Sequence, residues 1–197
     1  VSSVLDYSVE GQEEEAQFDA ALEMTLKTIE FAREREAIPF AVFKPTGFGC
    51  LDLYEKVGEK SVLSEAEQQE WNRVITRFDL ACKTAHEKNV LLLIDAEESW
   101  MQDAADAIVA DMMRKYNKEK AIVYNTFQLY RKDRLGFLKQ TIAKGKANGF
   151  HVGAKLVRGA YMEKERERAA EKNYPDPIQP TKEATDNNYN AAVDFVL

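Results

Sequence analysis

The sequence contains little cysteine and little histidine. Its 197 residues include two cysteines, Cys50 and Cys82, and two histidines, His86 and His151. The cysteines lack the spacing of a metal site and are expected to be ordinary thiols in a reducing compartment. Neither histidine has a second soft ligand nearby in the sequence, so a zinc site or a histidine-based nucleophilic triad is disfavoured. The sequence therefore predicts no bound metal.

The sequence also lacks an excess of positive charge and a long apolar run. It has 27 Lys and Arg against 34 Asp and Glu, a formal net charge of -7. Nucleic-acid binding requires clustered basic side chains, so no nucleic-acid partner is expected. No run approaches the roughly 18 apolar residues of a spanning helix, and the first residues do not have the pattern of a signal peptide. Peripheral association with a membrane is compatible with this pattern.

Helical periodicity is present in several segments. In the range 13–36, apolar residues recur at three- and four-residue steps. Ser64 and Glu67 have the spacing of a capping box, which predicts that a helix begins there with Ile75 and Cys82 on its apolar side.

Further helices are expected in the second half of the chain. Ser99 and Gln102 have the spacing of a second capping box, and another apolar pattern predicts a helix that ends near Gly149. The range 173–181 holds three prolines and is expected to be a loop. The range 182–197 is helical in character and has no closing signal, which predicts that the intact protein continues well beyond it.

Short apolar runs between the helices are typical of buried parallel strands. They are IPFAVF from Ile38, VLLLID from Val90, AIVYNTF from Ala121 and FHVGAKLV from Phe150, and VSSVLDY is an earlier candidate. Strand–helix units of this length build either a closed barrel or an open doubly wound sheet. No G-x-G-x-x-G follows a strand, which favours the barrel. We predict an α/β fold in which residues 1–197 form roughly the first five strands of a TIM-like (β/α)8 barrel.

Polar residues stand where the predicted strands end, at the face that carries the active site in such barrels. They are Asp6, Lys44, Asp95, Gln128 and Arg158. A single polar residue at a strand end usually marks only that end, whereas five long or charge-capable side chains favour a binding site.

The groups after the second and third strands are suited to an anionic ligand. Lys44 precedes a Pro-Thr-Gly turn, where a lysine either anchors a carboxylate or is simply solvated. Asp95, in IDAEES, is a carboxylate that would hold a neighbouring lysine charged. At least one of Glu97 and Glu98 is expected to lie in the first turn of the next helix.

The segment KLVRGAYMEKERER contains the densest set of candidates. Lys155 and Arg158 flank a strand end, the two small residues that follow let a planar ligand approach the backbone, and Tyr161 supplies an aromatic wall. This combination suits a large anionic cofactor. The charges in the range 163–168 are expected to form a solvated helix face.

Six motifs, LDYSVEG, FKPTG, IDAEES, YNTFQLYRKD, GAKLVRGAYMEKER and YPDPIQPTKEAT, together resemble the proline dehydrogenase family, particularly its monofunctional, mitochondrial-like branch. The motifs span nearly the whole chain in family order. The resemblance implies an FAD-dependent oxidation of L-proline to 1-pyrroline-5-carboxylate, the first step of proline catabolism, with electrons passed to a membrane quinone. It also implies a place in the mitochondrial matrix at the inner membrane or in the bacterial cytoplasm. Residues 1–197 would be the N-terminal and central part of one FAD-binding barrel.

The resemblance also implies roles for particular residues. Lys44 and Asp95 would be the catalytic, substrate-side pair, and Leu156 and Tyr161 would line the proline pocket. The cofactor-binding residues would be Gln128 at the isoalloxazine edge, Lys155 near the reactive flavin nitrogen, Val157, Arg158, Gly159, Ala160, Tyr161 and Met162 along the cofactor, and Thr181 and Lys182 at its distal part. The position of Lys155 is often arginine in bacterial relatives. The family's late helix with paired arginines is not in this sequence, so the segment alone is expected to bind proline poorly.

Two other functions are compatible with the pattern. One is a barrel aldolase or lyase in which Lys44 forms a Schiff base with a carbonyl substrate. The other is a non-catalytic interaction protein that binds through the acidic ranges 13–15 and 163–171. Such charge runs are usually solvated helix faces, which favours an enzyme.

Overall fold

The computed structural model describes residues 2–6, 9 and 11–197, with the side chains of residues 5 and 6 left out of the description. Within these residues, five parallel strands form one sheet: β1 (Val4–Asp6), β2 (Phe40–Phe43), β3 (Leu91–Ile94), β4 (Val123–Gln128) and β5 (Gly153–Val157). Each strand pairs with the next along the chain, in the order β1-β2-β3-β4-β5. A doubly wound sheet reverses its strand order at a switch point, whereas a barrel does not. The consecutive order confirms the predicted barrel-type arrangement of about five strands.

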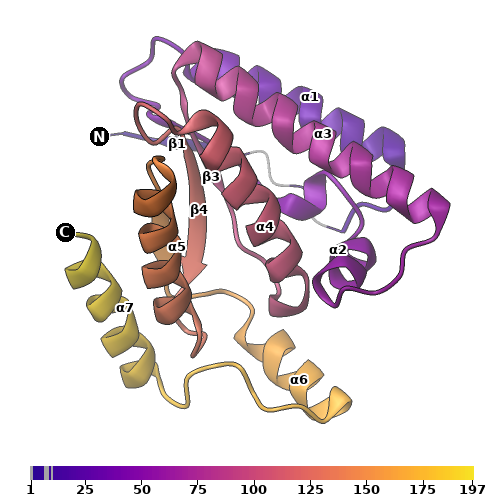
Figure 1. The fold of residues 1–197 in the computed structure, drawn as a ribbon, viewed down its shortest axis with the longest axis vertical. Coiled ribbons are helices and arrows are strands. Elements are labelled where there is room, and N and C mark those ends of the chain that lie inside the picture. Colours follow the sequence, from indigo (N-terminus) through magenta and orange to yellow (C-terminus); the bar gives the residue numbers. More distant parts are fainter. Residues whose placement is uncertain (1, 7–8, 10) are drawn as a thin grey trace.

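The helices are α1 (Glu15–Ala32), α2 (Leu51–Gly58), α3 (Glu65–Lys88), α4 (Ser99–Tyr116), α5 (Arg134–Asn148), α6 (Met162–Lys172) and α7 (Lys182–Val196), with a 3₁₀ turn at Pro45–Gly47. Helices α1, α3, α4 and α5 contact one another in this order and cover one face of the sheet (Figure 1). In the described part of the chain, no helix has the length and apolar character needed to cross a membrane.

Local signals account for where several helices begin and end. The Ser64–Glu67 capping box is confirmed: the Glu67 N–H donates to Ser64 Oγ at 3.3 Å, and the Ser64 N–H donates to Glu67 Oε2 at 2.8 Å. The C-cap residues of helices α3 and α5 are Asn89 and Gly149, with φ of 57° and 66°. The left-handed conformation closes a helix by satisfying its last carbonyl groups. The predicted end near Gly149 is therefore confirmed, as is the absence of helix in the range 173–181.

Two predictions about the helices are wrong, and one helix was not predicted. Helix α1 is shorter than the predicted range 13–36. Ile75 is 37% exposed, because it lies at the margin of the buried stripe of α3. Helix α2 was not predicted, since its eight residues are too few to show a clear period.

The second predicted capping box is also wrong. Helix α4 begins at Ser99 as expected, but its N-cap is Glu98 and Ser99 does not cap it. Instead, the Ser99 hydroxyl donates to Glu165 of α6, and Gln102 Oε1 accepts from the Glu97 N–H at 2.9 Å. A contact from a distant part of the chain thus replaces the local one.

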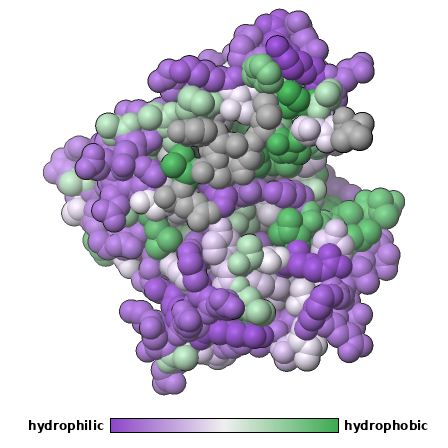
Figure 2. All heavy atoms as spheres, turned by 180° about the vertical axis from the view of Figure 1, so that it is seen from behind, coloured by the Kyte–Doolittle hydropathy of each residue, from purple (hydrophilic) through white to green (hydrophobic). Residues whose placement is uncertain are grey.

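The hydrophobic core formed by the described residues has two parts. The larger one packs α1, α3 and α4 on the sheet and includes Cys82, which is fully buried as predicted. The smaller one joins β4, α5 and α7 through Phe127, Leu138 and Ala192. On the side of the molecule that faces away in Figure 1, hydrophobic patches are exposed among hydrophilic ones (Figure 2).

Candidate active site

A cavity of about 330 Å³ lies at the carboxyl ends of β2 to β5. The residues that line it come from four successive strands and the loops after them: Lys44, Asp95, Ala96, Thr126, Gln128, Lys155, Val157, Arg158, Gly159, Ala160 and Tyr161. Parallel strands bring their carboxyl ends to one face, which explains why residues distant in sequence meet here. The structure therefore brings most of the predicted site residues together, while Asp6 has no described side chain.

Lys155 and Asp95, which both line this cavity, form an ion pair. Their side chains are 30% and 18% exposed, so the pair is partly shielded from solvent. Thr126 of β4 lies between their strands, and its hydroxyl donates to the Ile94 carbonyl at 2.8 Å. Asp95 thus pairs with Lys155, although the sequence placed it with Lys44, which lines the same cavity.

Glu97 connects two walls of the cavity, a role that the sequence did not indicate. Its carboxylate accepts a hydrogen bond from the Thr46 hydroxyl at 3.0 Å, and its carbonyl accepts one from Gln128 Nε2 at 2.7 Å. Thr46 belongs to the turn after Lys44, and Gln128 ends β4. The bond to Glu97 fixes the orientation of the Gln128 amide, which lines the cavity.

The Glu97 carboxyl group is almost completely buried, at 1% exposure. Its pKa is raised from 4.5 to about 7, chiefly by burial. The hydrogen bonds from Thr46 and the charge of Lys44 oppose the rise, and the neighbouring Glu98 adds to it. A carboxyl group with this pKa exchanges its proton near neutral pH, next to the predicted substrate side of the cavity.

Replacing Glu97 by glutamine is expected to flatten the pH dependence of stability. Because the pKa is higher in the folded state, the native protein holds more protons than the unfolded chain between about pH 4.5 and pH 7. The wild-type free energy of unfolding should therefore fall by on the order of 1 kcal/mol per pH unit over this interval, relative to the Glu97→Gln variant. Urea unfolding at several pH values measures the slope, and equal slopes for the two proteins would contradict the assignment.

Gly159 is required by a neighbouring aromatic ring. Its φ is +136°, and a Cβ added to it would lie 2.3 Å from Cδ1 of Tyr130. The backbone reinforces this contact, since the Tyr130 N–H donates to the Arg158 carbonyl at 2.6 Å. The sequence explained Gly159 by the approach of a ligand, whereas the structure shows that Tyr130 occupies the space of a side chain.

Substituting Gly159 by alanine is expected to lower the free energy of unfolding by about 2–4 kcal/mol, since the change adds steric overlap to an unfavourable φ. Gly136→Ala is the matched control, because Gly136 lies inside α5 and a Cβ there meets no atom within 4 Å. That control should gain about 0.5–1 kcal/mol from helix propensity. Urea denaturation compares the two variants, and similar changes in both would show that Tyr130 does not impose glycine.

Four predicted residues lie outside the cavity lining. Leu156 alternates with its neighbours along β5 and packs against the smaller core cluster, so its predicted contact with proline stays a prediction. Met162 begins α6 and is 43% exposed. Thr181 is the N-cap of α7, where its hydroxyl accepts from the Ala184 N–H at 3.1 Å, and Lys182 pairs with Asp186.

The acidic and basic run of α6 is not wholly a solvated face, contrary to the prediction. Glu165 is 0% exposed and accepts hydrogen bonds from both the backbone N–H and the hydroxyl of Ser99. These bonds offset the cost of burying the carboxylate and join α6 to the start of α4. Apart from the helical spacing of Glu165, no pattern in the sequence indicates this contact.

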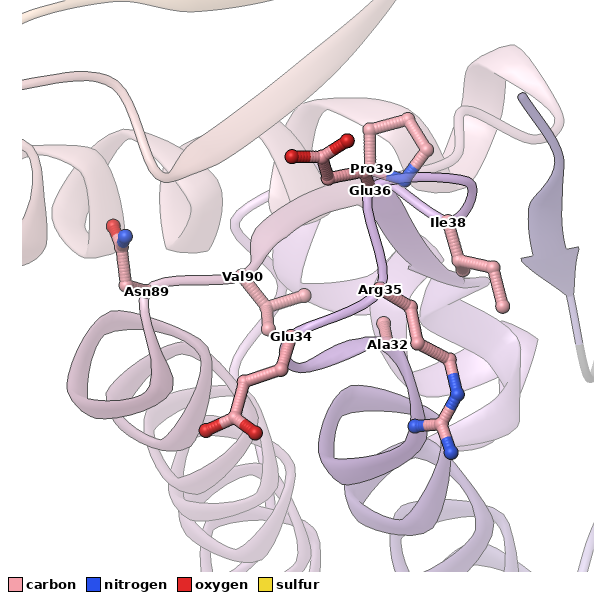
Figure 3. A pocket seen from close by; sticks show the side chains of 8 residues that line it. All are labelled: Ala32, Glu34, Arg35, Glu36, Ile38, Pro39, Asn89 and Val90. Atoms are coloured by element: carbon pink, nitrogen blue, oxygen red, sulfur yellow. The ribbon is translucent and has the colours of Figure 1, made fainter. Parts of the chain in front are cut away.

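A second cavity, of about 360 Å³, lies between the end of α1, the end of α3 and the strands that follow them (Figure 3). Its polar residues include Glu34, Arg35, Glu36 and Asn89. The Arg35 guanidinium lies 3.9 Å from the centre of the Phe31 ring. This cavity is at the amino ends of β2 and β3, the face that usually serves stability in a barrel, so it is not the candidate active site.

The parallel strands, paired in consecutive order, define a (β/α)-barrel protein. Its candidate site is the cavity at the carboxyl ends of the strands, which is lined by cationic side chains and lies at the usual catalytic face. The sequence model of the family "Proline dehydrogenase" matches residues 1–197. The chain therefore belongs to the proline dehydrogenase family, as the motifs predicted.

Individual relatives agree with this assignment. The carbapenem antibiotics biosynthesis protein CarD of Pectobacterium carotovorum is 39% identical over 196 residues, which cover 100% of this chain and 51% of CarD. Human proline dehydrogenase 1, mitochondrial, is 42% identical over 137 residues, 70% of this chain and 23% of the human protein. The chain thus spans about half or less of the length of these relatives.

Solved structures resemble the fold. Proline utilization A (PutA) from Bdellovibrio bacteriovorus matches 99% of this chain and 21% of its own, with a TM-score of 0.81 and 16% sequence identity. PutA from Bradyrhizobium japonicum gives a TM-score of 0.82 at 18% identity, over 98% of this chain and 20% of its own. At these identities the likeness supports the TIM-like barrel fold alone.

Proposed function

We propose that the protein is an FAD-dependent proline dehydrogenase that oxidises L-proline to 1-pyrroline-5-carboxylate. The observation that carries the proposal is the cavity in which Lys44, Asp95, Lys155, Gln128 and Arg158 meet at the strand ends. Family membership over the whole chain and the names of the mitochondrial relatives support the same reaction. Residues 1–197 would form the N-terminal and central part of a single FAD-binding barrel.

The residues present fit FAD. The cavity offers the fixed amide of Gln128, the ammonium of Lys155 and the guanidinium of Arg158, beside two small residues. Arg158 and Lys182 both pair with the carboxylate of Asp186, which shows that their cationic groups converge on one anionic group. The flavin would be held by Gln128 and Lys155, and the phosphates by Arg158 with Thr181 and Lys182. When bound, FAD would supply the hydride acceptor.

The chain's own residues would bind and orient proline. The Lys44 ammonium would attract the substrate carboxylate, and Tyr161 would cover the pyrrolidine ring. Asp95 would hold the Lys155 ammonium in place through their ion pair. Oxidation removes a hydride from the ring carbon next to nitrogen and a proton from that nitrogen, so that a C=N bond forms.

The electron acceptor and the location are part of the same proposal. Electrons from the reduced cofactor would pass to a membrane quinone, reached by peripheral association. The mitochondrial relatives and the bacterial CarD support a location in a mitochondrion or in a bacterium. There the protein would lie in the mitochondrial matrix at the inner membrane or in the bacterial cytoplasm.

An absorbance spectrum of the purified intact protein tests the function. It should show flavin bands that bleach when L-proline is added without oxygen. A protein that stays colourless after incubation with FAD would overturn the proposal. Covalent labelling of Lys44 by borohydride with a carbonyl substrate would instead identify a Schiff-base lyase.

A further inference from the structure

Arg158 is held on two sides by residues of α7. Its Nε–H donates to Asp186, and its guanidinium lies 4.4 Å from the centre of the Tyr189 ring. Asp186 and Tyr189 are three residues apart, so they lie on the same face of the helix. The contacts engage the Nε edge and one face of the guanidinium. An anion that binds Arg158 in this arrangement would receive its hydrogen bonds from the two Nη groups.

Lys182 belongs to the same cluster. It lies one turn before Asp186 on α7 and donates to the other carboxylate oxygen. The Arg158 and Lys182 side chains are 49% and 83% exposed, whereas that of Asp186 is 27% exposed. Two long, exposed cationic side chains are therefore gathered by one shorter and more shielded carboxylate. Both cations hold the pKa of Asp186 below its usual value, so the carboxylate is ionised at neutral pH.

We propose that Asp186 and Tyr189 are positioning residues for the diphosphate of FAD. They place the Arg158 guanidinium and the Lys182 ammonium together beside the cavity, and they do so without touching the reacting atoms. The inference rests on the proposed function, because it concerns how that cofactor is held. An arginine that is already oriented loses less side-chain entropy when it binds an anion, and this strengthens binding.

The measurement is the dissociation constant of FAD and, separately, of riboflavin, determined by flavin fluorescence with the intact apoprotein. Riboflavin has the same ring system without phosphates. Asp186→Asn should weaken FAD binding about tenfold and leave riboflavin binding unchanged. Tyr189→Leu should act in the same direction. Asp194→Asn, also on α7 and exposed, is the matched control and should change neither constant.

A second comparison separates positioning from a general effect on the fold. In a background that carries both Arg158→Met and Lys182→Met, Asp186→Asn should add little further loss, since both of its proposed partners are absent. An equal weakening of FAD and riboflavin, or unchanged or tighter FAD binding in Asp186→Asn, would overturn the inference while leaving the proposed function intact. A wild-type protein that binds neither flavin would overturn the proposed function and this inference with it.

Discussion

Substituting Asp95 by asparagine is expected to lower the rate constant for proline oxidation by about 100-fold, because small displacements of groups at a reacting centre have effects of this size. Asparagine keeps the shape of aspartate but removes the charge that holds the Lys155 ammonium. Lys155 is then free to move within the cavity, towards the position assigned to the flavin. The binding of FAD should change less, since Arg158 and Lys182, which are assigned to its phosphates, pair with Asp186 and not with Asp95.

Anaerobic stopped-flow reduction of the bound flavin by L-proline measures this rate constant directly. Asp111→Asn is a matched control, because Asp111 is an exposed residue of α4 and pairs only with its helix neighbour Arg114 in the contacts described. A Lys155→Met variant should lose activity too, and the double variant should lose less than the product of the two single effects. If the rate constant of Asp95→Asn lies within twofold of wild type, Asp95 does not have the proposed role of holding Lys155 for the reaction.

The site could largely be predicted because a parallel barrel has a simple rule for its active face. Strands β2 and β3 are short and apolar, so the first polar residue after each, Lys44 or Asp95, is easily recognised. Gln128 was found because it follows the predicted strand AIVYNTF, although it is the last residue of β4. The pairing between strand ends could not be predicted. It depends on the register of the strands. Thr126 of β4 stands opposite Lys155 of β5, and its short side chain lets Lys155 reach Asp95, which directly follows β3.

Local rules failed where a distant residue offered a better partner. The Ser99–Gln102 spacing matches a capping box. In the structure, however, the backbone N–H and the hydroxyl of Ser99 both donate to the buried Glu165 of α6. Glu165 itself looked like part of a solvated run because periodicity gives the face of a helix and not what covers that face. Likewise, two consecutive glutamates after Asp95 indicated a helix start, while the burial of Glu97 under the turn at Thr46 is a tertiary feature.

A buried network joins α4, β4 and α5 behind the candidate site. Asp106 accepts hydrogen bonds from Arg134 Nη1 at 2.6 Å, from Gln102 Nε2 at 2.9 Å and from Asn125 Nδ2 at 2.8 Å. The side chains of Asp106 and Arg134 are only 5% and 6% exposed. Gln102 also accepts from the Glu97 N–H, so the network reaches the wall of the cavity. An ionised carboxylate at this depth requires its partner.

Replacing Arg134 by alanine is therefore expected to lower the free energy of unfolding by about 3–5 kcal/mol at neutral pH, because Asp106 loses its counter-ion in a buried site. Arg114→Ala removes an arginine of α4 whose ion pair with Asp111 is 61% exposed on both sides, and it should cost less than about 1 kcal/mol. Urea unfolding measures both variants. Burial favours the protonated form of an unpaired carboxyl group, so the loss in Arg134→Ala should shrink as the pH is lowered. Equal losses in the two variants would show that the buried pair contributes no more than a surface one.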